Sequence, residues 1–318
     1  MLRSHFVAGM LSVGMLVLGA GVVGGQNYPN KPIRIVTSPQ GGASDYVARV
    51  VAEGISGPLG QPVIVENRPA NITAEIVANA QPDGYTLGLV GQSLWIRTLL
   101  EKTSYDVARD FSPITLTNMD PTILGVLASL PAKSVKELIA LAKARPGELN
   151  YSSAGTGAIG HLAAELLKSL AGINLVQINY KGAGPTLNAL LAGEVQLSFG
   201  TVGAMAPILK SGKVRALAVT SAQPSALAPG LPPIAATLPG YEYINKGVIL
   251  APAKTPATII NRLNREIVRV IHSADVKENF LNRGLEAVGT SPKEIDALIK
   301  SEMVRMGKVI KDAGIRVD

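Results

Sequence analysis

Short apolar runs alternate with longer amphipathic runs along most of this chain. Residues 32–38, 62–68 and 84–91 are rich in Ile, Val and Leu and predict buried strands. Residues 41–60 carry apolar side chains at helical spacing and predict a helix between the first two strands. Strands that alternate with helices predict an α/β fold, with mostly parallel sheets flanked by helices.

The same alternation continues to the end of the chain. Further strands are expected at residues 111–119, 122–129, 149–153, 174–180, 195–200, 214–221 and 244–254. Further helices are expected at 72–80, 92–101, 159–171, 181–194, 201–213, 256–272 and 292–311, and another begins at Ser134. In open α/β sheets, ligands bind at the carboxyl ends of strands, where the helices begin.

The first 25 residues differ from the rest. After Arg3 and His5, an apolar, glycine-rich run continues without a charged residue until Lys31. This pattern predicts a signal peptide at residues 1–25, cleaved before Gln26, and hence an exported, periplasmic protein. The run is also long enough for the alternative reading as a membrane anchor.

Composition narrows the function classes. The 318 residues suffice for two domains, and the net charge of +7 is spread along the chain with only one Trp, so we expect no nucleic-acid partner. The chain has no Cys and three His, which leaves no basis for a metal site or a cysteine nucleophile. No G-x-S-x-G motif presents a serine nucleophile, so we do not expect this protein to be an enzyme.

One motif has the spacing of a dinucleotide-binding loop. The stretch SAGTGAIGHL (153–162) reads G-x-G-x-x-G through Gly155, Gly157 and Gly160. A dinucleotide site also needs an acidic residue about 20 positions on, and residues 166–193 contain no Asp or Glu. We therefore expect no cofactor, and read the stretch either as a helix start that holds an anion or as a tight turn without a ligand.

Glycine-containing turns also precede other predicted helices. They lie at residues 38–45, 90–93, 152–160, 180–185 and 199–204, two in the first third of the chain and three in the middle. Two groups of such turns suggest two lobes that face each other across one cleft. The pattern favours binding over catalysis, because acid–base residues are scarce around it.

A set of ordered motifs resembles one known family. The motifs include YPNKPIRIV (28–36), QPDGYTLGL (81–89), SVKELIALAKARPGELNYSSAGTGAIGHLAAELLKSLAG (134–172), VQINYKGAGPTLNALLAGEVQLSF (176–199) and ILAPAKTP (249–256). Together they resemble the Bug family, the TctC-like substrate-binding proteins of tripartite tricarboxylate transporters. The resemblance covers nearly the whole chain after the leader.

The resemblance implies a type II periplasmic binding-protein fold of two α/β lobes that close on a small ligand, often a carboxylate. It implies lobe 1 from residues 26–123 and 248–318, lobe 2 from 124–247, and hinge crossings near 119–127 and 244–251. It also implies a monomer that passes its ligand to the membrane permease of a tripartite transporter. Two alternatives stay open: a binding module that feeds a sensor kinase, and a secreted enzyme.

The family's ligand-binding loops map onto the same turns. The positions implied here are Ser38, Gln40, Gly41, Gly42, Ala43, Gly91, Gln92, Ser93, Ser153, Ala154, Gly155, Thr156, Gly157, Tyr180, Lys181, Gly182, Gly200 and Thr201. The loop TSPQGG (37–42) is shorter than usual and lacks an aromatic residue, and NRPANITAE (67–75) lacks a glycine-rich insert. Gly200 replaces a usual acidic residue, which favours an anionic or uncharged ligand over one that carries an ammonium group.

Overall fold

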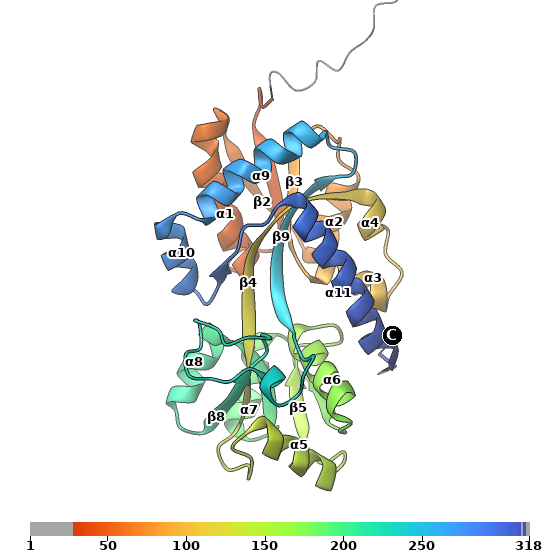
Figure 1. The fold of residues 1–318 in the computed structure, drawn as a ribbon, viewed down its shortest axis with the longest axis vertical. Helices are drawn as coiled ribbons and strands as arrows, with labels where there is room; N and C mark the ends of the chain where they lie inside the picture. Colours follow the sequence, from red (N-terminus) through yellow and green to blue (C-terminus); the bar gives the residue numbers. More distant parts are fainter. Residues whose placement is uncertain (1–27, 313, 316–318) are drawn as a thin grey trace, which may run out of the picture.

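Two lobes are stacked along the long axis of the molecule and joined by strands that run through both (Figure 1). The computed structural model describes residues 28–312, 314 and 315. The predicted signal peptide, residues 1–25, lies outside the described residues.

The first lobe contains a mixed sheet in the order β2-β1-β3-β9-β4, with β10 added beside β4. Its strands are β1 (Ile33–Thr37), β2 (Val63–Asn67), β3 (Thr86–Gly91), β4 (Phe111–Leu127), β9 (Ile244–Pro252) and β10 (Glu286–Ala287). β1 pairs in parallel with β2 and β3, whereas β9 pairs antiparallel with β3 and β4. The alternation of strands and helices did not predict this antiparallel pairing.

The second lobe repeats the arrangement on a smaller scale. Its strands are β5 (Asn150–Ser153), β6 (Val176–Asn179), β7 (Leu197–Thr201) and β8 (Val214–Val219). β5 pairs in parallel with β6 and β7, and the second half of β4 pairs antiparallel with β7 and β8.

Helices cover both faces of each sheet because alternate strand residues point to opposite faces. In the first lobe, Ile33 and Ile35 pack with α1 (Ala43–Leu59), α9 (Ala257–Ile271) and α10 (Ala274–Leu281). Val36 faces the other way, toward a cluster that contains residues of α2 (Ala70–Ala78), α3 (Ser93–Leu100) and α11 (Pro292–Asp312). The short α4 (Val107–Asp110) precedes β4. In the second lobe, α5 (Val135–Ala144) and α6 (Ile159–Ala171) cover one face of the sheet, and α7 (Ala183–Ala192) and α8 (Val202–Lys210) cover the other.

One hydrophobic cluster continues from lobe to lobe. It joins Trp95 of α3, Leu162 of α6 and Ile299 of α11, all of which are buried. α11 contacts both α3 and α6, so the C-terminal helix packs against elements of both lobes (Figure 1).

β4 passes between the lobes near its middle. Pro121 still pairs with Ile244 of the first-lobe sheet, and Thr122 already pairs with Thr201 of the second. The expectation of two separate strands at 111–119 and 122–129 was therefore wrong: the chain changes partners at Pro121 without leaving the extended conformation. The predicted lobe boundaries at 123/124 and 247/248 fall within β4 and β9.

Buried charges lie at this crossing. The Lys246 Nζ on β9 is 3.3 Å from the Glu302 carboxylate on α11, and both residues are buried. Arg305 adds a second cation 2.7 Å from Glu302. Burial lowers the pKa of Lys246, and the Glu302 carboxylate opposes that effect.

Candidate functional site

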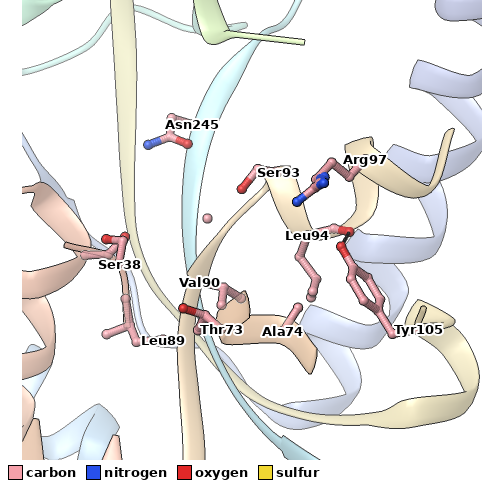
Figure 2. Close-up of a pocket in the computed structure, with 12 residues that line it drawn as sticks. Ser38, Thr73, Ala74, Leu89, Val90, Ser93, Leu94, Arg97, Tyr105 and Asn245 are labelled. Atoms are coloured by element: carbon pink, nitrogen blue, oxygen red, sulfur yellow. Dashed lines mark hydrogen bonds between the residues drawn. The ribbon is translucent and has the colours of Figure 1, made fainter. Parts of the chain in front are cut away.

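A cavity of about 200 Å³ lies in the first lobe, where β1 and β3 end and α1 and α3 begin (Figure 2). This position is where α/β sheets bind ligands. Its lining residues are Ser38, Ser44, Thr73, Ala74, Leu89, Val90, Gly91, Ser93, Leu94, Arg97, Tyr105 and Asn245.

The loop after β1 is held by two buried or half-buried polar side chains. Asn67 donates from Nδ2 to the Ser38 carbonyl at 2.7 Å and to Asp45 Oδ1 at 2.8 Å. Asp45 Oδ2 accepts from the Gly41 backbone N–H at 3.0 Å, so this N–H is already used within the protein. Burial alone would raise the pKa of Asp45, but hydrogen bonds from Arg49, Asn67 and Gly41 outweigh burial and lower it.

The helices that begin at this cavity have no side-chain caps. α1 begins after Gly42, which has no side chain, and α3 begins after Gln92, whose side chain accepts no hydrogen bond from the helix start. By contrast, Asp106 caps α4 and Ser134 caps α5 through their side chains. Free N–H groups and the positive end of the helix dipole make the starts of α1 and α3 suitable for an anion.

Among the described residues that line the first-lobe cavity, Arg97 is the one basic residue. Its side chain is 40% exposed, and among the described residues its only hydrogen bond runs from Nε to Glu101. In Figure 2 the guanidinium lies beside Ser93, one helical turn earlier on α3. Arg97 is not among the residues predicted from the sequence, although its spacing of four residues from Ser93 places both on one helix face.

A second cavity, of about 340 Å³, lies in the second lobe at the ends of β5 and β7. Its lining residues are Thr122, Ser152, Ser153, Ala154, Ala158, Ile159, Gly160, Ala183, Thr186, Leu187, Phe199, Gly200, Thr201 and Ala204. None of them is ionisable, and the Ser152 hydroxyl is bonded to Ser198 and Thr186. The helices that begin here, α6 and α7, again lack side-chain caps.

The SAGTGAIGHL stretch runs from the end of β5 through a loop into the first turn of α6. The Gly157 N–H donates to His161 Nδ1 at 3.0 Å, and burial lowers the pKa of His161. Gly157 has φ of 78°, and a Cβ there would lie 2.9 Å from Leu100 Cδ1 at the end of α3. This loop therefore abuts the first lobe as well as the second-lobe cavity.

The turn after β6 is arranged differently. The Tyr180 hydroxyl donates to Glu194 at 2.9 Å, and Lys181 is exposed. Gly200 lines the second cavity, and a Cβ there would lie 3.0 Å from both Leu187 and Met205. An acidic side chain at position 200 would thus need these apolar neighbours to move.

Some of the predicted site residues line one of the two cavities, and the others line neither. Ser38, Gly91 and Ser93 line the first-lobe cavity, and Ser153, Ala154, Gly200 and Thr201 line the second. The lining of these two cavities does not include Gln40, Gly41, Gly42, Ala43, Gln92, Gly155, Thr156, Gly157, Tyr180, Lys181 or Gly182. Gln92 is 3% exposed, so its side chain is directed into the protein.

Four further lining residues of the first cavity were not predicted from the sequence: Ser44, Thr73, Tyr105 and Asn245. These residues reach it from four segments far apart in the chain, and no local motif marks them. Over the part of the chain that the structure describes, no cluster of three or more His, Asp or Glu side chains suits a metal ion. Within the same residues, no helix combines the length and the apolar character needed to cross a membrane.

Two α/β lobes, two connecting strands and a cavity at the strand ends of each lobe define a two-lobe solute-binding protein. The model of the tripartite tricarboxylate transporter family receptor, TctC, matches residues 47–315. The chain belongs to this family of periplasmic binding proteins, so the predicted family and two-lobe fold are confirmed.

Relatives agree with this assignment. The chain is 33% identical over 318 residues to protein BugT of Bordetella pertussis (strain Tohama I), covering 96% of this chain and 97% of BugT. The structure of R. palustris Rpa4515 with adipate is 34% identical, with a TM-score of 0.76, covering 91% of this chain and 99% of that chain. MatC (Rpa3494) from Rhodopseudomonas palustris, solved with bound malate, is 28% identical, with a TM-score of 0.72, covering 89% and 100% of the two chains. The family consists of substrate-binding proteins, and this chain is a binding protein rather than an enzyme.

Proposed function

We propose that this protein is exported through a cleaved leader and captures a small carboxylate in the periplasm as a monomer. It then delivers the carboxylate to the membrane permease of a tripartite tricarboxylate transporter. Family membership supports the transporter, and the uncharged run before Lys31 supports export.

The observation that carries the carboxylate assignment is the pair of uncapped helix starts beside Arg97. A carboxylate in the first-lobe cavity would accept from the free N–H groups of α1 and α3. Ser38 and Ser93 add hydroxyl donors, and Arg97 adds a cation at the rim. An anion gains roughly 0.3–1 kcal/mol from each helix end at the surface and more where it is partly buried.

The second lobe supplies the other half of the site. Its cavity is largely apolar and suits the carbon chain of the ligand, while the starts of α6 and α7 suit a second carboxylate. Among the residues that the structure describes, no acidic side chain lines either cavity, so a ligand ammonium would find no ionic partner among them. The adipate and malate named for two solved relatives support the same ligand class.

Capture requires lobe closure, because each half of this site belongs to a different lobe. β4 and β9 serve as the hinge, and the ligand stabilises the closed state by its contacts with both lobes. Small-angle scattering with saturating ligand is expected to show a more compact particle than the ligand-free protein. An unchanged profile would contradict closure.

A thermal-shift panel tests the ligand class directly. At a concentration one hundred times its Kd, a ligand that binds only the folded state adds about 2.7 kcal/mol of stability. Purified protein is screened against mono-, di- and tricarboxylates, with amines and neutral sugars as controls, and carboxylates alone are expected to raise Tm. A response only to amines or sugars would overturn the assignment, and N-terminal sequencing of periplasmic protein near Gln26 tests export.

A further inference from the structure

Asn245 presents an oriented amide to the first-lobe cavity. It lies near the start of β9, at the crossing between the lobes, and lines the cavity. Its Nδ2 donates to Asp120 Oδ2 at 2.6 Å. Figure 2 shows the amide oxygen on the side of Ser93 and the nitrogen on the opposite side.

Asp120 fixes this orientation. The residue is 3% exposed, and its other oxygen, Oδ1, accepts from Asn118 Nδ2 at 2.7 Å. An ionised carboxylate only accepts hydrogen bonds, so both amides must turn their nitrogens toward it. Asn118 is held in turn, because its Oδ1 accepts from the Thr117 hydroxyl at 2.8 Å.

The amide oxygen of Asn245 is left facing the cavity. It lies beside Gly91, 3.7 Å from the position that a Cβ at residue 91 would take. Within residues 28–312, no protein group donates a hydrogen bond to this oxygen. It is an acceptor among donors, since the starts of α1 and α3, Ser38, Ser93 and Arg97 all offer N–H or O–H groups.

We propose that Asn245 determines specificity by accepting a hydrogen bond from a ligand hydroxyl, so that the preferred ligands are hydroxy-substituted carboxylic acids. The carboxylate occupies the donors of the first lobe, and the hydroxyl nearby meets Asn245 Oδ1. A plain carboxylic acid of the same length leaves this acceptor without a partner once water is excluded. This inference rests on the proposed function.

Isothermal titration calorimetry with matched probes tests the inference. The probes are malate, succinate and aspartate, which share four carbons, and 2-hydroxyadipate with adipate. For the wild type, the hydroxy acid of at least one pair is expected to bind about tenfold more tightly than its unsubstituted partner. Malate is also expected to bind more tightly than aspartate, because none of the described residues that line the cavity carries a carboxylate to meet an ammonium group.

Two variants separate specificity from folding. Asn245→Leu removes the acceptor and is expected to bring the ratio of the two affinities close to one. Asp120→Asn keeps the volume but can donate to Asn245, which lets the Asn245 amide turn its nitrogen to the cavity, so the ratio is expected to fall or invert. Asp275→Asn changes the same charge at an exposed position on α10 and is expected to keep the wild-type ratio.

The outcomes are distinct. Equal affinities within every pair for the wild type, or an unchanged ratio in Asn245→Leu, would overturn this inference and leave the proposed function standing. Tighter binding of aspartate than malate would overturn the hydroxyl assignment. If no carboxylate of the panel binds, the proposed function fails and this inference fails with it. Thermal unfolding of each ligand-free variant shows that it is folded.

Discussion

Replacing Asp120 by Asn is expected to stabilise this protein at neutral pH. Burial raises the pKa of Asp120 from 3.8 to about 6, although Asn245, Asn118 and the Lys246 charge act in the opposite direction. The folded protein must therefore hold an ionised carboxylate in a place that disfavours the charge. Asparagine has nearly the same shape and cannot ionise.

The magnitude follows from the difference between the two pKa values. Since a tenfold change in proton affinity is worth about 1.4 kcal/mol, raising the pKa from 3.8 to about 6 corresponds to about 3 kcal/mol. Between these values the folded protein binds more protons than the unfolded chain, so the wild-type free energy of unfolding falls as pH rises through this window. Asp120→Asn has no ionisable group at this position, so this fall in the free energy of unfolding does not occur in the variant.

The assay is urea unfolding from pH 4 to pH 8, followed by the fluorescence of the buried Trp95 and by circular dichroism. Asp120→Asn is expected to exceed the wild type by up to about 3 kcal/mol at pH 7 and to match it near pH 4. Asp275→Asn, at an exposed site, is expected to show no such difference. A variant that is less stable by a constant amount at every pH would refute the reasoning, because it would mean that Asp120 acts through fixed contacts and not through its charge.

Three further predictions concern other groups. Glu302→Gln is expected to lower the free energy of chemical unfolding by about 3–5 kcal/mol, because it leaves Lys246 buried without its carboxylate. Lys246→Met is expected to cost less, because Glu302 still pairs with Arg305, and the reverse order would contradict this reasoning. Arg97→Gln is expected to weaken carboxylate binding about 10- to 100-fold by calorimetry. An unchanged Kd would show that Arg97 does not contribute to ligand binding. Gly157→Val is expected to lower unfolding free energy by about 1–2 kcal/mol, since φ is 78°, and equal stability in urea would contradict it.

Much of the fold was predictable because local pattern and tertiary structure agree. The helix at 159–171 was predicted with both ends, since its apolar stripe is strong and Gly172, with φ of 62°, ends it. α10 (Ala274–Leu281) was missed because Phe280 is its only buried residue and its pattern is weak. The break expected near Pro121 was wrong because proline also fits a position where a strand changes partners.

The site was predictable only where it consists of loops at strand ends. Ser38, Ser93 and Ser153 lie at or directly beside such loops, and their place follows from the order of elements. Asn245 and Asp120 are 125 residues apart, and their hydrogen bond depends on how β4 and β9 pair. No local pattern contains that information.

Asp120 raises a question that stability alone does not answer. At neutral pH the charge of a buried carboxylate opposes folding. Replacing such a carboxylate by asparagine removes this penalty and is generally tolerated. What asparagine does not reproduce is a group that only accepts hydrogen bonds, and this is the property that turns the Asn245 oxygen toward the cavity. One substitution therefore moves two measurements in opposite directions: Asp120→Asn gains stability at pH 7 and loses the preference for hydroxy acids. If the variant gained stability and kept the preference, the orientation of Asn245 would depend on something other than the Asp120 charge.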